Sequence, residues 1–336
     1  MENEFATTTA DNTLRDTKRH FSKLGLMFLL GTLMIYGVQI GASAIANAVD
    51  PELMNSTAYA LLITMIPMYA IAMPLMALLI RTVPASSLEK KKMTAGQWIL
   101  AFLMCYGGMY VSNYIGIILT QVIGAIKGSP VSNNMVEVAT SSNILVNFFI
   151  MVICAPIAEE LLFRKLLIDR TVKYGEATAI LFSGLMFGLF HGNLNQFVYA
   201  FVLGLFFGFI YVKTGNIRYT ILLHMLVNFL GSVVGVIILN WLGDEFINAL
   251  SDTSLLMTYA MDNMPKIMTY FIYIILLLGI AITGIVLLIV NAKKIHFQPG
   301  EVTIPKGKRF STTVVNVGMG FYFLFWIFTI IFQLLQ

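Results

Sequence analysis

The chain has 336 residues, of which 58% are hydrophobic and only 11% are charged, and its formal net charge is +4. A soluble domain carries roughly 25% charged residues, so this composition excludes a soluble globular protein. The chain also lacks the polar, basic or cysteine-dense sequence of a disordered segment, a nucleic-acid-binding protein or a disulfide-stapled secreted scaffold. Apolar runs of about 20 residues recur from end to end, and this length matches the thickness of a bilayer. The sequence therefore predicts an all-α polytopic transmembrane helix bundle, with the lipid bilayer as its partner and no nucleic acid.

Nine apolar segments are bounded by glycine, proline and charged residues, and we predict a membrane-spanning helix in each. They cover residues 24–47, 57–80, 97–124, 143–172, 177–192, 197–212, 219–242, 267–291 and 312–335. The fifth and sixth segments are short and joined by a tight link at residues 192–195, so eight spans with a half-inserted hairpin is the alternative count. The first segment is long enough to span and follows 23 mostly polar residues, which favours a retained helix over a cleaved signal peptide.

The basic residues predict the orientation of the chain in the cell membrane. Of the 21 lysines and arginines, 19 lie in alternate segments that begin with the N-terminus, and the opposite loops hold only Lys127 and Lys266. Lysine and arginine in short loops stay on the cytoplasmic side of a membrane. We therefore expect a cytoplasmic N-terminus and, with nine spans, a C-terminus outside.

Polar and ionisable residues occur inside three of the predicted helices, where such residues are costly and usually functional. They are Glu159, Glu160 and Arg164 in the fourth segment, His191 in the fifth, and His224 and Asn228 in the seventh; the apolar Phe187 lies on the same helical face as His191. A purely structural role as interhelical hydrogen bonds is the competing interpretation, and such bonds contribute about 0.6 to 2 kcal/mol each. That role gives no reason for a general base, two imidazoles and an amide donor to occur together.

Helix geometry separates the two neighbouring glutamates. Glu160 and Arg164 are four residues apart and share a face, where their opposite charges can pair. Glu159 points about 100° away around the axis, so its carboxylate is free to address another group. At 1.5 Å per residue, Glu159 lies roughly 20 Å and His191 roughly 24 Å from the cytoplasmic ends of their helices. We expect the cavity that holds these groups to open toward the cytoplasm.

In their order and spacing these residues resemble the motifs of the CPBP family of intramembrane proteases, also called the CAAX-protease or Abi family. The motifs are EExxxR at Glu159, Glu160 and Arg164, FxxxH at Phe187 and His191, and HxxxN at His224 and Asn228. The resemblance implies a bacterial member of the family with a protease core of four helices. We divide the chain accordingly into a cytoplasmic N-terminal segment (1–23), three transmembrane helices (24–142), the protease core (143–243), and an external loop with two further helices (244–336).

The resemblance also implies an intramembrane endopeptidase that hydrolyses a peptide bond of a membrane-associated protein or peptide substrate. Carried over, Glu159 activates a water molecule and His191 is its partner in handling the proton. His224 and Asn228 stabilise the oxyanion as neutral N–H donors.

The remaining motif residues receive supporting roles from the same resemblance. Glu160 and Arg164 hold the helix and the charge balance of the site, and Phe187 is a weaker candidate for a contact with the substrate. We favour a mechanism without a cofactor. The alternative is a zinc ion bound by Glu159, His191 and His224; the HExxH motif of many zinc proteases is missing from the sequence.

Two other classes of function stay open. A catalytically silent membrane scaffold or immunity-type protein could use the same helices to bind a peptide or a lipid-linked partner. A secondary transporter could use intramembrane glutamate and histidine as a proton relay, but the paired repeats typical of that class are not evident in the sequence.

Overall fold

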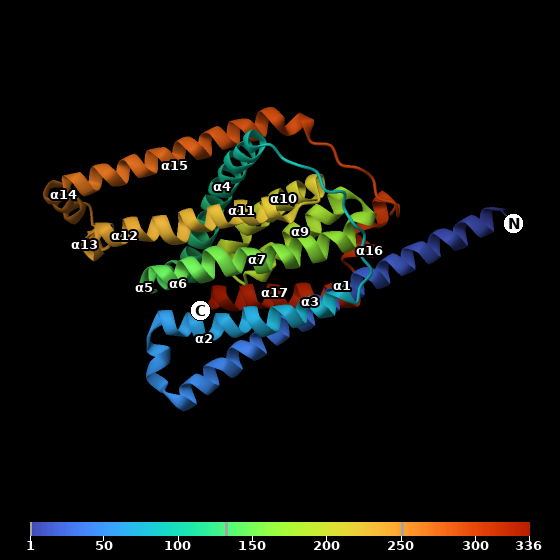
Figure 1. The fold of residues 1–336 in the computed structure, drawn as a ribbon, viewed down its shortest axis with the longest axis horizontal. Coiled ribbons are helices and arrows are strands. Elements are labelled where there is room, and N and C mark those ends of the chain that lie inside the picture. Colours follow the sequence, from blue (N-terminus) through green and yellow to red (C-terminus); the bar gives the residue numbers. More distant parts are fainter. Residues whose placement is uncertain (1, 132–133, 250–251) are drawn as a thin grey trace.

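The computed structural model describes residues 2–131, 134–249 and 252–336, and all regular structure within these ranges is helical. Residue 1, residues 132–133 and residues 250–251 belong to the predicted segments 1–23, 24–142 and 244–336 and lie outside the described residues. The expected all-α polytopic bundle is confirmed, and Figure 1 shows its arrangement.

The helices follow one another in three groups. The first group is α1 (Glu2–Val49), α2 (Thr57–Pro67), α3 (Met73–Arg81), α4 (Ala95–Lys127) and α5 (Asn134–Ser141). The central group is α6 (Ile144–Asn147), α7 (Ala155–Glu160), α8 (Asp169–Thr171), α9 (Glu176–Phe190), α10 (Leu194–Thr214), α11 (Ile217–Phe229) and α12 (Val236–Leu242). The last group is α13 (Asp244–Ala249), α14 (Thr253–Asp262), α15 (Met264–Asn291), α16 (Arg309–Thr313) and α17 (Val317–Leu335). Turns of π-helix at Met68–Ala72, Phe148–Cys154, Leu161–Ile168 and Leu230–Gly235 join the shorter pieces into continuous long helices.

Eight of these continuous helices are long and apolar enough to cross a membrane. They are Asp11–Val49, Thr57–Arg81, Ala95–Lys127, Ile144–Tyr174, Leu194–Thr214, Ile217–Leu242, Met264–Lys294 and Val317–Leu335. The predicted fifth span, residues 177–192, corresponds to α9, whose 15 residues cover only about 22 Å. Among the described residues, eight helices are thus long enough to span, and the short α9 forms a hairpin with α10, as in the alternative prediction.

Polar caps and glycines set the limits of the helices around the short α9. Thr94 and Gln97 form a capping box at the start of α4, and the Asn193 side chain accepts a hydrogen bond from the Gln196 N–H at the start of α10. The last turn of α10 ends at Gly215, whose left-handed backbone (φ 58°) suits glycine. A Cβ at Gly204 of α10 would come within 2.7 Å of the Gly184 Cα of α9, so two glycines allow these neighbours to pack closely.

The connections that carry most of the lysines and arginines of the described loops meet at one end of the bundle, which we call the basic end: residues 82–94, 172–175, 213–218 and 292–308. Here the Lys91 N–H donates to the Thr214 carbonyl, and the Lys23 ammonium donates to the Thr82 carbonyl. We call the other end of the bundle the opposite end. There the Lys127 ammonium donates to the Leu334 carbonyl. α17 thus begins near the basic end, where the Gly318 N–H donates to the Ser22 hydroxyl, and finishes at the opposite end. Figure 1 also shows the N-terminal part of α1 projecting beyond the basic end.

The four predicted parts of the chain stay a prediction. α1 continues without a break through residue 23, so the N-terminal segment and the first span are one helix. The expected core corresponds to the continuous stretch from α6 to α12, which includes three helices with candidate catalytic residues.

Candidate active site

The helix that carries the two glutamates has an interrupted hydrogen-bond pattern just before them. Residues Phe148–Cys154 are π-helical, and the Ala155 N–H donates to the Ile150 carbonyl, five residues back. The next donor in this pattern would be Pro156, which has no N–H, so the Met151 carbonyl is left without the partner that the pattern supplies. Turns of π-helix are frequent at functional sites. Here the interruption leaves a backbone acceptor beside the candidate catalytic residues.

The side chain of Asn228 fills that vacancy from another helix. Its amide nitrogen Nδ2 donates to the Met151 carbonyl at 2.8 Å. This bond joins α11 to the glutamate helix, and it uses one of the two amide hydrogens of Asn228. The second hydrogen remains available for another acceptor.

Glu160 and Arg164 form the ion pair expected from their spacing. The Arg164 Nε atom lies 3.0 Å from the Glu160 Oε2 atom, and both side chains are 0% exposed. The guanidinium also donates from Nη1 to the Ser183 hydroxyl, which donates in turn to the Phe163 carbonyl. The ring of Phe187 lies 4.6 Å from the guanidinium carbon, close enough for a cation–π contact. Arg164 is therefore held on several sides and serves as the buried counter-charge of the site.

His224 lies between the two glutamates. Its Nδ1 atom is 3.1 Å from Glu160 Oε1, and its Nε2 atom is 3.8 Å from Glu159 Oε2. Because a carboxylate accepts, Nδ1 donates to Glu160, and the neutral ring then carries no hydrogen on Nε2. In this tautomer a neutral His224 presents no N–H toward Glu159, and its expected role as a donor to the oxyanion stays a prediction. An N–H on Nε2 requires the doubly protonated ring.

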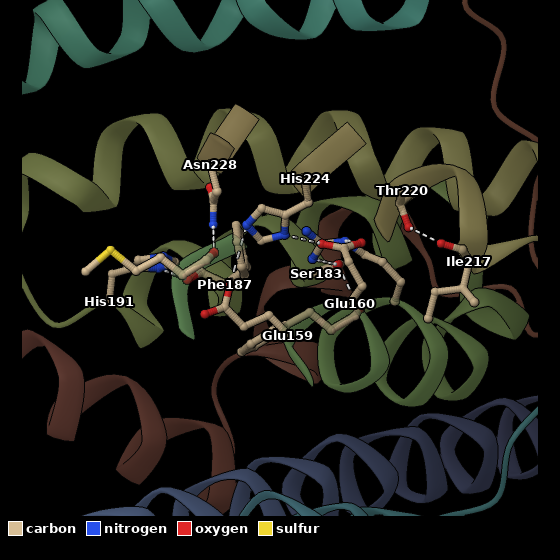
Figure 2. Close-up of polar contacts among 12 residues, drawn as sticks. Glu159, Glu160, Ser183, Phe187, His191, Ile217, Thr220, His224 and Asn228 are labelled. Atoms are coloured by element: carbon tan, nitrogen blue, oxygen red, sulfur yellow. Dashed lines mark hydrogen bonds and ion pairs between the residues drawn. The ribbon is translucent and has the colours of Figure 1, made fainter. Parts of the chain in front are cut away.

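The carboxylate of Glu159 is the accessible member of the pair. Its side chain is 14% exposed, whereas that of Glu160 is fully buried. Figure 2 shows Glu159, His191 and His224 gathered around the Phe187 ring. The ring centroids of His191 and His224 lie 4.9 and 5.7 Å from that of Phe187. Three helices thus bring their motif residues together, as the sequence predicts.

The imidazole of His191 has a defined donor and acceptor. Its Nδ1 atom lies 2.9 Å from the Phe187 carbonyl, which can only accept. Nδ1 therefore carries the hydrogen, and Nε2 of the neutral ring is an acceptor. The carboxylate of Glu159 interacts electrostatically with this ring. An acceptor nitrogen and an acceptor carboxylate can together bind the two hydrogens of one water molecule.

Phe187 was predicted as a weak substrate contact, and its position does not support that role. Its side chain is 0% exposed and lies beneath both imidazoles and beside the Arg164 guanidinium. We assign it to positioning of the two histidines.

The predicted zinc alternative was tested against the donor geometry. Across residues 2–131, 134–249 and 252–336, no group of three His, Cys, Asp or Glu side chains is placed to hold a metal ion. Both the metal-free mechanism and the zinc alternative with Glu159, His191 and His224 stay predictions.

Three residues near the site, Ser183, Tyr199 and Tyr69, were not predicted from the sequence. Ser183 lies four residues before Phe187 on the same helical face, a spacing that could have revealed it. The Gln196 amide donates to the Tyr199 hydroxyl, and Tyr199 interacts electrostatically with Glu159. Tyr69, from the π-helical turn Met68–Ala72, does so as well. Nothing in the sequence around Tyr69 indicates that contact.

Fold and site together define a class: a polytopic helical membrane protein with an accessible glutamate and two histidines on intramembrane helices, above a buried glutamate–arginine pair. Residues 141–230 match the family model described as type II CAAX prenyl endopeptidase Rce1-like. This match contains all three motifs, and it confirms for this segment the resemblance found in the sequence. Residues 141–230 are therefore similar to the Rce1-like CAAX proteases.

Two curated bacterial proteins are similar to the chain. The membrane-embedded CAAX protease MroQ of Staphylococcus aureus (strain USA300) is 30% identical over 149 residues, which are 42% of this chain and 58% of MroQ. The putative membrane peptidase YdiL of Bacillus subtilis (strain 168) is 27% identical over 160 residues, 45% of this chain and 62% of YdiL. The chain thus spans about three fifths of the length of these relatives. No solved structure matches it.

Proposed function

We propose that the chain is an intramembrane endopeptidase that hydrolyses a peptide bond of a membrane-associated polypeptide with a glutamate-activated water. One observation carries the proposal: Glu159 is partly accessible and lies beside two histidines, while Glu160 is buried against Arg164. The CAAX-protease family match of residues 141–230 and the printed descriptions of the two relatives support the same class of activity.

The geometry supports a specific first step. A water that donates one hydrogen to the Glu159 carboxylate and the other to the His191 Nε2 atom keeps an oxygen lone pair free for attack. As that oxygen forms a bond to the carbonyl carbon of the scissile peptide, Glu159 takes the proton. The carbonyl oxygen of the substrate becomes the oxyanion of a tetrahedral intermediate.

The second step uses donors on the facing helix. Asn228 keeps one amide hydrogen free, and doubly protonated His224 offers an N–H on Nε2; both can donate to the oxyanion. Collapse of the intermediate breaks the C–N bond, and Glu159 returns its proton to the leaving amine. Water has then added its hydroxyl to the acyl product and its hydrogen to the amine.

We further propose that the protein acts in the cell membrane with its basic end in the cytoplasm. Most of its lysines and arginines lie in the loops of that end, in line with the rule for short loops. The C-terminus then lies outside, because α17 runs to the opposite end.

The test is cleavage of a membrane-anchored peptide library by the purified protein in proteoliposomes. The wild-type protein should cleave a subset of the library, and Glu159→Gln should not. Glu89→Gln is the matched control, because the Glu89 side chain is 80% exposed at the basic end and pairs only with Lys91. Equal activity in both variants removes Glu159 from the mechanism. Binding of peptides without any cleavage favours the silent scaffold instead.

A further inference from the structure

The basic end of the core is covered by two extended connections. In residues 82–94, the Ser86 N–H donates to the Asp169 carbonyl, which holds this connection against the end of the glutamate helix. In residues 292–308, the Val302 N–H donates to the Lys173 carbonyl. Charged pairs add to this cover, including Lys165 with Asp169 at 2.6 Å.

The layer between the site and the basic end is densely packed. Leu162, Phe163, Leu167 and Ile168, which follow Glu160 on the same helix, are at most 2% exposed. Thr171, at the end of that helix, is fully buried. A polypeptide that approached Glu159 through these buried residues would have to displace their side chains.

Packing on the other side of the site is much looser. None of the residues of α2, all of which the structure describes, is buried. The stretch His191–Asn195 is partly exposed throughout, as are residues 228–230 of the facing helix. Figure 1 shows α1, α2 and α15 spreading apart toward this end. The residues near the site are thus less buried toward the opposite end than toward the basic end. The sequence predicted the reverse, an opening on the side of the basic loops.

The turn between α9 and α10 lies well below the opposite end. A Cβ at Gly116 of α4 would meet the Asn195 carbonyl at 2.8 Å, so the turn contacts α4 eleven residues before its last residue, Lys127. Those eleven residues rise about 16 Å. On the other side, Gly192 faces Thr329 of α17, six residues or about 9 Å before the end of that helix. The site is thus recessed from the opposite end.

The recessed turn carries polar groups that continue the site. Asn193 donates to the His191 carbonyl and to the Gln196 side-chain carbonyl, and Gln196 donates to the Tyr199 hydroxyl. Tyr199 therefore accepts with its oxygen and keeps its own hydrogen for another acceptor. Amide and hydroxyl groups of this kind suit the polar backbone of an extended peptide.

We propose that the substrate chain reaches Glu159 from the opposite end and lies along the turn of residues 191–196. This inference rests on the proposed function. It makes the substrate class a membrane-anchored polypeptide whose scissile segment is at the face of the membrane away from the basic loops.

The test is directional labelling of single cysteines with a membrane-impermeant maleimide, in intact cells and in inverted membrane vesicles. The background is Cys105→Ala and Cys154→Ala, which removes both native cysteines. Exposed reference positions are Ser87→Cys at the basic end and Ser254→Cys at the opposite end. The reporters are Ser232→Cys, one turn beyond Asn228, and Thr329→Cys, beside Gly192.

We expect both reporters to react in the preparation in which Ser254→Cys reacts, and to be protected in the one in which Ser87→Cys reacts. The access route is overturned if the reporters follow the pattern of Ser87→Cys, if they react in both preparations, or if they react in neither. Two reporters guard against a single misfolded variant, and each variant must elute like the parent from a sizing column. Labelling needs no catalysis. An inactive protein with the expected labelling pattern would therefore contradict the endopeptidase proposal and leave the access route standing. An active protein with the reverse labelling pattern would contradict only the proposed access route.

Discussion

The Nδ1 atom of His224 lies 3.1 Å from the carboxylate of Glu160, and this contact joins the third sequence motif to the first inside the bundle. It fixes which nitrogen of His224 faces the accessible glutamate. It also makes Glu160 a shared partner of a histidine and an arginine, so the two neighbouring glutamates differ in both exposure and attachment.

The first prediction concerns the two glutamates. Glu159→Gln should abolish cleavage and leave thermal stability in detergent close to that of the wild type, because no buried charge loses its partner. Glu160→Gln should also lower stability, since it leaves Arg164 unpaired in a fully buried site, and breaking such a pair costs roughly 3 to 5 kcal/mol. Thermal unfolding followed by intrinsic fluorescence provides the comparison. Equal midpoints for both variants would contradict the division of roles.

The second prediction concerns the bond between Asn228 and the Met151 carbonyl. Asn228→Ala should lower stability by about 1 kcal/mol, because the carbonyl loses its donor. Adding Pro156→Ala restores a backbone N–H near the same carbonyl and should recover much of that loss. Cleavage should stay low in the double variant, since the amide is still missing from the oxyanion.

Pro156→Ala alone is the control for the second prediction. If the double variant is no more stable than Asn228→Ala, the proline is not the reason that Met151 needs a partner from another helix. Recovery of activity together with stability would instead assign Asn228 a purely structural role.

The third prediction tests the buried position of Phe187. Phe187→Leu keeps an apolar side chain but removes the ring that supports both imidazoles and covers the guanidinium. Stability should fall by roughly 1 to 2 kcal/mol. In steady-state kinetics kcat should fall while KM changes little, because the residue does not touch the substrate. A change confined to KM would restore the substrate contact expected from the sequence.

The fourth prediction separates the two mechanisms for water activation. Protein treated with a strong chelator and freed of metal should still cleave its substrate, and Glu159→Gln and His191→Ala should each abolish cleavage. Elemental analysis of the active protein should find less than one zinc per chain. Loss of activity on chelation with recovery on adding zinc would support the ligand set of Glu159, His191 and His224 and overturn the metal-free mechanism.

Much of this arrangement follows from local patterns in the sequence. Apolar length predicts the long helices, and i to i+4 spacing predicts the pair of Glu160 with Arg164. The grouping of the three motifs on neighbouring helices was also predicted, through the resemblance to a known family. These features depend on contacts close in sequence or on spacings that are already known.

Other features depend on packing that no local pattern encodes. The bond between Asn228 and Met151 exists because Pro156 removes one donor from a π-helical turn, and a sequence pattern does not show where such a turn forms. The direction of access depends on how extended connections far apart in sequence cover one end. The electrostatic influence of Glu159 on Tyr69 likewise depends on how segments far apart in sequence pack together.

The short length of α9 has a consequence for the lipid around the protein. Its 15 residues rise about 22 Å, whereas the hydrocarbon layer of a typical bilayer is about 30 Å thick. The amides of residues 192–196 then lie at a depth normally filled by acyl chains, unless the bilayer thins locally or water reaches them. Lipid chain length should therefore tune this protein: reconstitution in thin bilayers hydrates the turn, and thick bilayers place hydrocarbon over it. Under the proposed function, the rate of cleavage in proteoliposomes should therefore change with the chain length of the lipid.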